Sequence, residues 1–234
     1  MLYYYGNNYD KGVFMREIDI NSWKRASHYK LFGSYANPSF KVEVRLDMTN
    51  FMKNRPDGDG FFIPFTYLLM KSANMFEGFR IRYLDGKVVC FDNVSPSFTV
   101  FLENENFAFC KAEFNNSYSL FAKSMKENID FVKKHALDKD AKDLYVTNNR
   151  ADLIYLSCLP WIDFTSTDNP LPYEDKTSMS IPRLNWGKCV KENDSYKMTL
   201  SLTVNHAYLD GYEASMMLST LQTMLNECEK HFND

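Results

Sequence analysis

Residues 204–215, VNHAYLDGYEAS, place one of four histidines four residues before an aspartate that a glycine follows. A histidine at the end of an apolar strand can be held in one tautomer and partly desolvated, so that it stays neutral near pH 7 and can act as a general base. Asp210 needs a cation if it is buried, because an unpaired buried carboxylate costs roughly 3 to 5 kcal/mol. Taken alone the pattern is short, and a histidine packed in the core is the alternative interpretation of His206.

The segment that carries His206, SYKMTLSLTVNH at 195–206, alternates strictly between mostly apolar and polar residues. The apolar face holds Tyr196, Met198, Leu200, Leu202 and Val204, and His206 takes the last position on it. The other face holds Lys197, Thr199, Ser201, Thr203 and Asn205. A period of two predicts a long strand that ends at the histidine. Beyond the turn, helical spacing predicts a C-terminal helix that buries Ala214, Met217, Leu218, Leu221, Met224, Leu225 and Cys228.

Three segments in the first third of the chain have clear patterns. INSWKRASHYKLF at 20–32 predicts an early helix with Asn21 or Ser22 as its cap. SFKVEVRLDMT at 39–49 alternates and predicts a half-buried strand. FFIPFTYLLMKSANMF at 61–76 predicts an apolar helix, which tolerates Pro64 in its first turn.

The middle of the chain predicts hairpins, one further helix and more strands. Asp85-Gly86 is a favoured two-residue turn between β-prone runs at 79–92, and residues 97–114 form a second candidate hairpin. A helix is expected at 118–135, and strands are expected within ADLIYLSCLPWIDFTS and SMSIPRLNWGKCV. Because the strands and helices follow no regular βαβ rhythm, we expect an α+β fold, a mixed sheet with helices packed on it. No linker or repeat interrupts the chain, so we expect a single domain over 1–234.

Composition narrows the class of protein. The chain has 234 residues, of which 45% are hydrophobic, and a net charge of −3, so it lacks the basic footprint that nucleic acid or an anionic membrane would attract. The start lacks a signal-peptide pattern and no apolar run reaches membrane-spanning length, so we expect a complete cytoplasmic protein. The five cysteines lack CxxC or metal-ligand spacing, so we expect reduced, mostly buried thiols and no metal. Cys158 has no histidine near it in sequence that would make it a nucleophile.

Several segments together resemble one family. NHAYLDGYEAS is similar to the HHxxxDG signature of the coenzyme A-dependent acyltransferases. DINSWKRASHYKLF, FRIRYLDGKVVCFDNVSPSFTVF and LSCLPWIDFTS resemble the opening, the central stretch and the serine-x-leucine-proline-tryptophan segment of the chloramphenicol acetyltransferase family. The pieces follow the family's order and nearly its spacing from residue 15 to about 228. The resemblance implies a two-layer α/β sandwich with the family's fold, which assembles as a homotrimer with the active site between subunits.

The resemblance also implies roles for four residues. His206 matches the general base that takes a proton from the acceptor hydroxyl, so that the oxygen attacks the thioester of acetyl-CoA. Asp210 matches a structural aspartate whose arginine partner has its counterpart in Arg25, and the pair would orient the base. Ser157 matches the serine whose hydroxyl stabilises the tetrahedral oxyanion, and an ordinary strand serine is the alternative. A single well-placed donor of this kind contributes roughly 3 kcal/mol.

The sequence departs from the family at several positions. Asn205 replaces the first histidine of the signature, but its side chain would lie off the face of the base. Asn185 stands where the family often has a threonine that holds an active-site water, and Lys188 matches a lysine near the 3′-phosphate of coenzyme A. Phe32 and Phe107 could supply aromatic walls of the acceptor pocket. The segment 163–185 differs from the family's and is about two residues longer, so the chemistry is better supported than the acceptor.

The resemblance therefore implies a chloramphenicol O-acetyltransferase, in which acetyl-CoA acetylates the 3-hydroxyl of chloramphenicol without an acyl-enzyme, an activity associated with antibiotic resistance. A related enzyme that acts on another hydroxyl or amine is the first alternative, because 163–185 is altered. A non-catalytic binding protein that keeps the fold is the second, and the joint presence of the four catalytic candidates argues against it. The acyltransferase core of 2-oxo acid dehydrogenase complexes shares HxxxDG but normally carries a lipoyl domain and linker.

Overall fold

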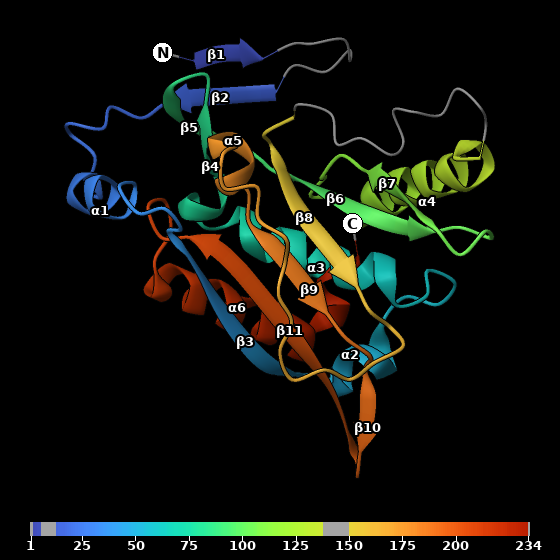
Figure 1. Cartoon of the computed structure of the whole chain (residues 1–234). Helices are drawn as coiled ribbons and strands as arrows, with labels where there is room; N and C mark the ends of the chain where they lie inside the picture. The colour runs from blue at the N-terminus through green and yellow to red at the C-terminus, as the bar shows by residue number, and fades with distance from the viewer. Residues whose placement is uncertain (1, 6–12, 138–149, 234) are drawn as a thin grey trace.

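The computed structural model describes residues 2–5, 13–137 and 150–233 (Figure 1). Its centre is a mixed sheet of seven strands, in which β11 pairs with β3 along one edge and with β9 and the short β10 along the other, and the sheet continues from β9 through β8 and β6 to β7. The pairs β6–β8 and β8–β9 are parallel, and the other pairs are antiparallel. The strands are β3 (Ser39–Asp47), β6 (Ser95–Phe101), β7 (Phe107–Lys111), β8 (Leu153–Cys158), β9 (Arg183–Trp186), β10 (Val190–Glu192) and β11 (Ser195–Asn205).

A second, antiparallel sheet has the order β1-β2-β5-β4. Its strands are β1 (Leu2–Tyr5), β2 (Val13–Glu17), β4 (Ile81–Leu84) and β5 (Lys87–Phe91). Asp85 and Gly86 join β4 to β5 with φ angles of 48° and 81°, the left-handed conformation that a tight hairpin requires at both positions. The hairpin predicted at 79–92 is therefore confirmed, and β6 and β7 confirm the one predicted at 97–114.

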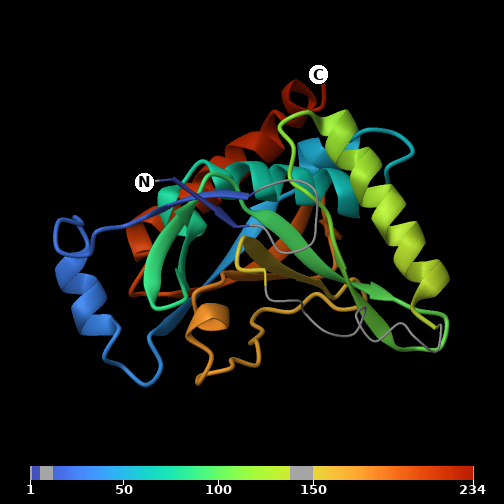
Figure 2. The same cartoon turned by 90° about the horizontal axis from the view of Figure 1, so that it is seen from above.

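The larger helices lie on one face of the mixed sheet (Figure 2). α3 is buried along nearly its whole length, as its apolar sequence predicts, with Pro64 in its first turn. α4 begins and ends at the predicted residues, and the predicted apolar positions from Ala214 to Leu225 are buried in α6. Cys228, predicted on the same helix, is buried in the 3-10 turn η3 that follows it. No helix in the described ranges is both long and apolar enough to cross a bilayer. The helices are α1 (Ala26–Phe32), α2 (Thr49–Asn54), α3 (Phe62–Asn74), η1 (Glu77–Arg80), α4 (Tyr118–His135), α5 (Lys176–Met179), α6 (Gly211–Asn226) and η3 (Cys228–His231).

The predicted cap of α1 is wrong. The helix begins at Ala26, with Arg25 at the N-cap position. Asn21 and Ser22 instead bond to the side chain of Asp19, through the Asn21 amide at 3.0 Å and the Ser22 hydroxyl at 2.9 Å. Because these side-chain bonds hold the chain in a turn, the helix starts three or four residues later than the predicted cap, Ser22 or Asn21, implies.

The polar face of β11 is covered as well as its apolar face. Thr199, Ser201 and Thr203 are at most 4% exposed, although the alternating pattern predicts that only one face is buried. The segment after β8 crosses this face opposite the helices, as Figures 1 and 2 show. Hydrogen bonds between this segment and the polar side chains compensate for their burial. The strand predicted within 178–190 is shorter than expected. β9 covers only four of these residues, and Ser178 and Met179 lie in α5.

Candidate active site

His206 lies at the end of β11, where the sequence predicts a candidate base. β11 ends at Asn205, but the His206 amide donates a hydrogen bond of 2.9 Å to the carbonyl of Pro38, the residue before β3. This bond extends the pairing of β11 with β3 by one residue. The imidazole stacks on Phe32, with ring centroids 3.9 Å apart and planes 5° apart, and Phe40 lies 4.8 Å away. Nδ1 is buried without a hydrogen-bond partner in the described part of the chain. Because the residue as a whole is half-buried, its accessible edge is the one that carries Nε2.

Arg25 ties together both ends of the turn that presents His206. Its guanidinium forms an ion pair with Asp210 and donates a second hydrogen bond, of 3.2 Å, to the backbone carbonyl of His206. The arginine side chain is only 8% exposed and the aspartate side chain 35%. The predicted partners therefore meet, and the pair fixes the residues between the base and α6.

Asp210 also caps α6, because its Oδ1 accepts a hydrogen bond of 2.9 Å from the Glu213 amide. Burial opposes ionisation of Asp210, but hydrogen bonds from the Glu213 amide and Arg25 outweigh it, so the pKa of Asp210 lies below its ordinary value. Glu213 adds an anchor that the sequence analysis missed, because its Oε1 accepts from the Gly78 amide at 2.8 Å. Gly78 has no side chain to block that approach, since an added Cβ would lie 2.5 Å from Glu213 Oε2.

Ser157 and Asn185 are cross-strand partners on β8 and β9, and Asn185 is in turn the partner of Ser201 on β11. Aligned residues on neighbouring strands project from the same face of a sheet. Ser157 and Asn185 therefore lie on the polar face, which the 159–175 segment covers. Asn185 is 3% exposed and donates a hydrogen bond of 3.0 Å to Asn169 Oδ1. Asn169 was not predicted as a site residue, because it comes from the segment that departs from the family.

Phe107 and Lys188 lie at the same end of the molecule as Ser157. Phe107 pairs with Phe101 on β6, and the register of β6 with β8 puts both on the Ser157 face. Lys188 is exposed just beyond β9, and its amide donates to the Ile162 carbonyl at 2.8 Å. We call Phe32, Arg25, His206 and Asp210 the histidine half-site, and Phe107, Ser157, Asn185 and Lys188 the serine half-site.

The two half-sites are far apart within one chain. His206 is five residues beyond Ser201 along β11, and Ser157 lies two strands across from Ser201 in the same register. With about 3.4 Å per residue and about 4.8 Å per strand, the separation is roughly 20 Å. Alternation along β11 also puts His206 and Ser157 on opposite faces of the sheet, because His206 follows Val204 on the apolar face, whereas Ser157 lies on the polar face. In Figure 1, β11 ends near α1 while β8 points away from it. A single chain therefore does not bring together the predicted base and the predicted oxyanion donor.

The five cysteines, all in the described ranges, are free thiols, and three of them are buried. Burial raises the pKa of Cys158, beside Ser157, to about 11, so its thiol stays protonated near neutral pH. No group of three or more His, Cys, Asp or Glu that could hold a metal ion occurs in the described part of the chain.

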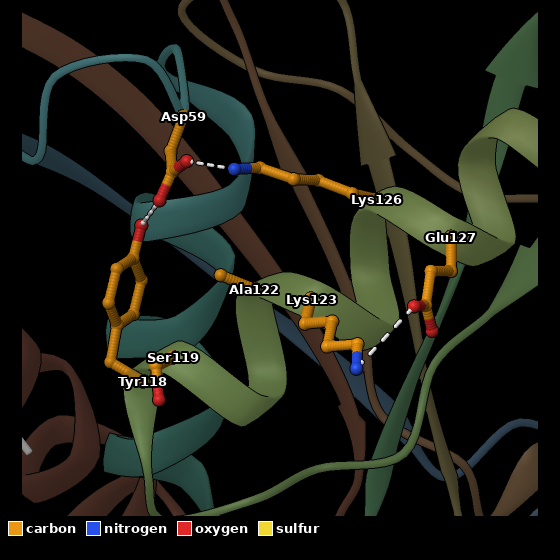
Figure 3. Close-up of a pocket in the computed structure, with 7 residues that line it drawn as sticks. All are labelled: Asp59, Tyr118, Ser119, Ala122, Lys123, Lys126 and Glu127. Atoms are coloured by element: carbon orange, nitrogen blue, oxygen red, sulfur yellow. Dashed lines mark hydrogen bonds and ion pairs between the residues drawn. The ribbon is translucent and has the colours of Figure 1, made fainter.

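A surface hollow lies beside α4, on the helical side of the molecule (Figure 3). Its charged groups pair with one another. Asp59 accepts a hydrogen bond of 2.5 Å from the Tyr118 hydroxyl and forms an ion pair with Lys126, and Lys123 pairs with Glu127. These contacts tie the loop before α3 to α4, and the hollow includes no residue of either half-site.

Known structures of similar fold define the class of protein. A solved chloramphenicol acetyltransferase superposes with a TM-score of 0.78 at 24% identity, over 90% of this chain and 99% of that one. A probable dihydrolipoamide acetyltransferase from Listeria monocytogenes gives a TM-score of 0.63 at 15% identity, over 94% and 97% of the two chains. The fold is therefore that of the coenzyme A-dependent acyltransferases, as the sequence predicts.

Sequence comparison gives the family within that class. The family model described as chloramphenicol acetyltransferase matches residues 13–222. Chloramphenicol acetyltransferase of Escherichia coli is 28% identical over 219 residues, which cover 90% of this chain and 93% of that protein. Chloramphenicol acetyltransferase 2 of Haemophilus influenzae is 27% identical, over 91% of this chain and 98% of that one. The chain belongs to the chloramphenicol acetyltransferase family, a family of acyl-CoA-dependent acetyltransferases.

Proposed function

We propose that this protein transfers the acetyl group of acetyl-CoA to the 3-hydroxyl of chloramphenicol. The observation that carries the proposal is the family match over 13–222 together with the turn at His206, which Arg25 and Asp210 lock. A histidine held in this way, with one nitrogen buried and the other edge accessible, suits a general base.

The reaction we propose is direct transfer. His206 Nε2 takes the proton of the acceptor hydroxyl while the oxygen attacks the thioester carbonyl carbon. The Ser157 hydroxyl donates a hydrogen bond to the oxyanion of the tetrahedral intermediate. The intermediate collapses with loss of the coenzyme A thiolate, which recovers the proton from the imidazolium, so the products are the 3-acetyl ester and free coenzyme A. The raised pKa of Cys158 supports transfer without an acyl-enzyme, because a protonated thiol is a poor nucleophile.

We further propose that the active enzyme is a homotrimer in which each site combines the histidine half-site of one subunit with the serine half-site of its neighbour. The separation of roughly 20 Å within one chain supports this, because catalysis needs the two groups in contact with one substrate. Exposed apolar side chains accompany both half-sites and suit a subunit interface. They are Leu31 and Tyr35 near Phe32, and Phe101, Trp161 and Ile162 near Ser157, each more than half exposed.

Three further assignments belong to this proposal. Phe32 and Phe107 are walls of the acceptor pocket from opposite sides of the interface. Lys188, exposed beyond β9, binds the 3′-phosphate of coenzyme A, and Asn185 holds an active-site water. A compact ammonium in solvent is suited to binding a phosphate as a point charge.

Release of coenzyme A, followed with a thiol reagent, tests the activity. Purified protein with acetyl-CoA and chloramphenicol should release thiol, and a His206→Ala variant should lose at least about 10²-fold in rate. Release no faster than from His206→Ala would sink the proposal.

Mixing two inactive variants tests the shared site. Equal amounts of His206→Ala and Ser157→Ala subunits, refolded or coexpressed, should regain activity, since about one quarter of interfaces then join an intact histidine to an intact serine. A mixture no more active than its components would contradict the shared site, even if the wild-type protein is active.

A second candidate function keeps the enzyme class but changes the acceptor to another small hydroxyl or amine compound. The observation that favours it is the 163–169 segment, whose polar contacts cover the face beside Ser157. Turnover on a panel of alcohols and amines without turnover of chloramphenicol would support it. A titration that detects no acetyl-CoA binding would instead favour a non-catalytic protein of the same fold.

A further inference from the structure

Asn169 connects the segment after β8 to the residue beside Ser157. Its Oδ1 accepts a hydrogen bond of 3.0 Å from Asn185 Nδ2, and its own Nδ2 lies 3.4 Å from Thr203 Oγ1. Thr203 stands on β11, on the same face as Asn185. A chain of hydrogen bonds therefore runs from β11 through Asn169 to the carboxamide next to the predicted oxyanion donor.

The segment that carries Asn169 is held on the sheet by its neighbours. The Thr167 carbonyl accepts from Lys41 Nζ at 2.8 Å and lies 3.5 Å from Ser201 Oγ. Ser166 donates to Glu43 at 2.8 Å. These bonds anchor the backbone just before Asn169 to β3 and β11, so that its side chain reaches Asn185 from the β11 side.

This approach direction decides which end of the Asn185 carboxamide faces Ser157. The amino end is engaged by Asn169 on the β11 side. The carbonyl end projects from the other side of the same planar group, and the next residue in the row across the sheet is Ser157 on β8. Asn185 is 3% exposed, so surrounding groups rather than water fix its orientation.

We propose that Asn169 is a positioning residue, which holds the amino group of Asn185 so that its carbonyl oxygen faces Ser157 and the reacting groups. This rests on the proposed function and adds a residue from the segment where this chain departs from its family. A carbonyl oxygen can only accept hydrogen bonds. A water that donates one hydrogen to Asn185 Oδ1 has its second hydrogen available for the oxyanion, whereas a reversed carboxamide would present a donor to that water.

Two substitutions at Asn169 separate orientation from simple packing. Asn169→Leu removes the acceptor for Asn185, so we expect kcat to fall about 10- to 100-fold with the KM for acetyl-CoA unchanged. Asn169→Asp keeps an acceptor for the Asn185 amino group and should retain most of kcat. Asn226→Leu is the matched control, because it removes an exposed carboxamide that bonds Gln222 at the end of α6, and kcat should not change.

A double-mutant comparison shows whether Asn169 acts through Asn185. In an Asn185→Ala background, Asn169→Leu should cause no further loss of kcat. A persistent loss would overturn the proposal, and so would equal activities of wild type and Asn169→Leu. If Asn169→Asp is as impaired as Asn169→Leu, the orientation is the reverse of the one proposed.

A readout independent of turnover separates this proposal from the proposed function. In protein labelled with ¹⁵N-asparagine, hydrogen exchange of the Asn185 carboxamide should be slow in the wild type and fast in Asn169→Leu. Fast exchange in the wild type would overturn the positioning role. Slow exchange in a protein that releases no coenzyme A with chloramphenicol would contradict the proposed acceptor and retain the role of Asn169.

Discussion

Replacing Asp210 by asparagine would isolate the charge that Arg25 requires. Asparagine can still cap α6, so the hydrogen bond to the Glu213 amide can persist. The guanidinium of Arg25, only 8% exposed, would lose its anion. Because the Asp210 side chain is 35% exposed, the cost lies between that of exposed and fully buried pairs, at about 2 kcal/mol. Asp210→Ala also removes the cap and should cost about 1 kcal/mol more.

Thermal unfolding at one fixed protein concentration would measure these costs, because subunit association makes the midpoint concentration-dependent. For a chain of this size, about 2 kcal/mol lowers the midpoint by roughly 4 to 8 °C. The kcat of Asp210→Asn should fall as well, since Arg25 also holds the His206 carbonyl. Asp130→Asn, at an exposed carboxylate on α4, is the matched control and should behave as the wild type.

Two results would refute this reasoning. One is a midpoint for Asp210→Asn equal to that of the control. The other is additivity in the double variant Arg25→Leu/Asp210→Asn, because removing both partners of a coupled pair should cost less than the sum of the single changes.

Three further predictions concern acid stability, thiol reactivity and the anchor of α6. The Lys197 ammonium lowers the pKa of Asp47 from its ordinary value of 3.8 to about 2. The ionised Asp47 carboxylate therefore stabilises the fold fully above pH 3.8, and this stabilisation is lost as pH falls through about 2. Asp47→Asn should flatten that part of a curve of unfolding free energy against pH. Cys158, whose pKa is raised to about 11, should resist iodoacetamide at pH 8 in native protein, and mass spectrometry showing rapid alkylation there would contradict this. Gly78→Ala should lower the thermal midpoint, because the new Cβ would meet Glu213 Oε2 at 2.5 Å; an unchanged midpoint would mean that the Glu213 anchor can move freely.

Local patterns were enough to predict much of the secondary structure. The Asp85-Gly86 turn and the helix at 118–135 were predicted at the observed residues, since turn geometry and helix spacing act over a few residues. The cap of α1 was not, because Asp19 competes for Asn21 and Ser22. The burial of Ser201 on the polar face of β11 was also missed, since a segment more than thirty residues earlier in the chain covers it.

The sequence by itself determined that His206 ends a strand on its apolar face, and the resemblance it carries named Arg25 as the partner of Asp210. Only the tertiary structure decided that Arg25 bonds both Asp210 and the His206 carbonyl, because two segments far apart in the chain must meet there. It also decided that Ser157 and His206 lie roughly 20 Å apart on opposite faces, since strand order and register set that distance. The contact between Asn169 and Asn185 has the same origin: it depends on how a segment crosses the sheet, which residue types and local spacing do not specify.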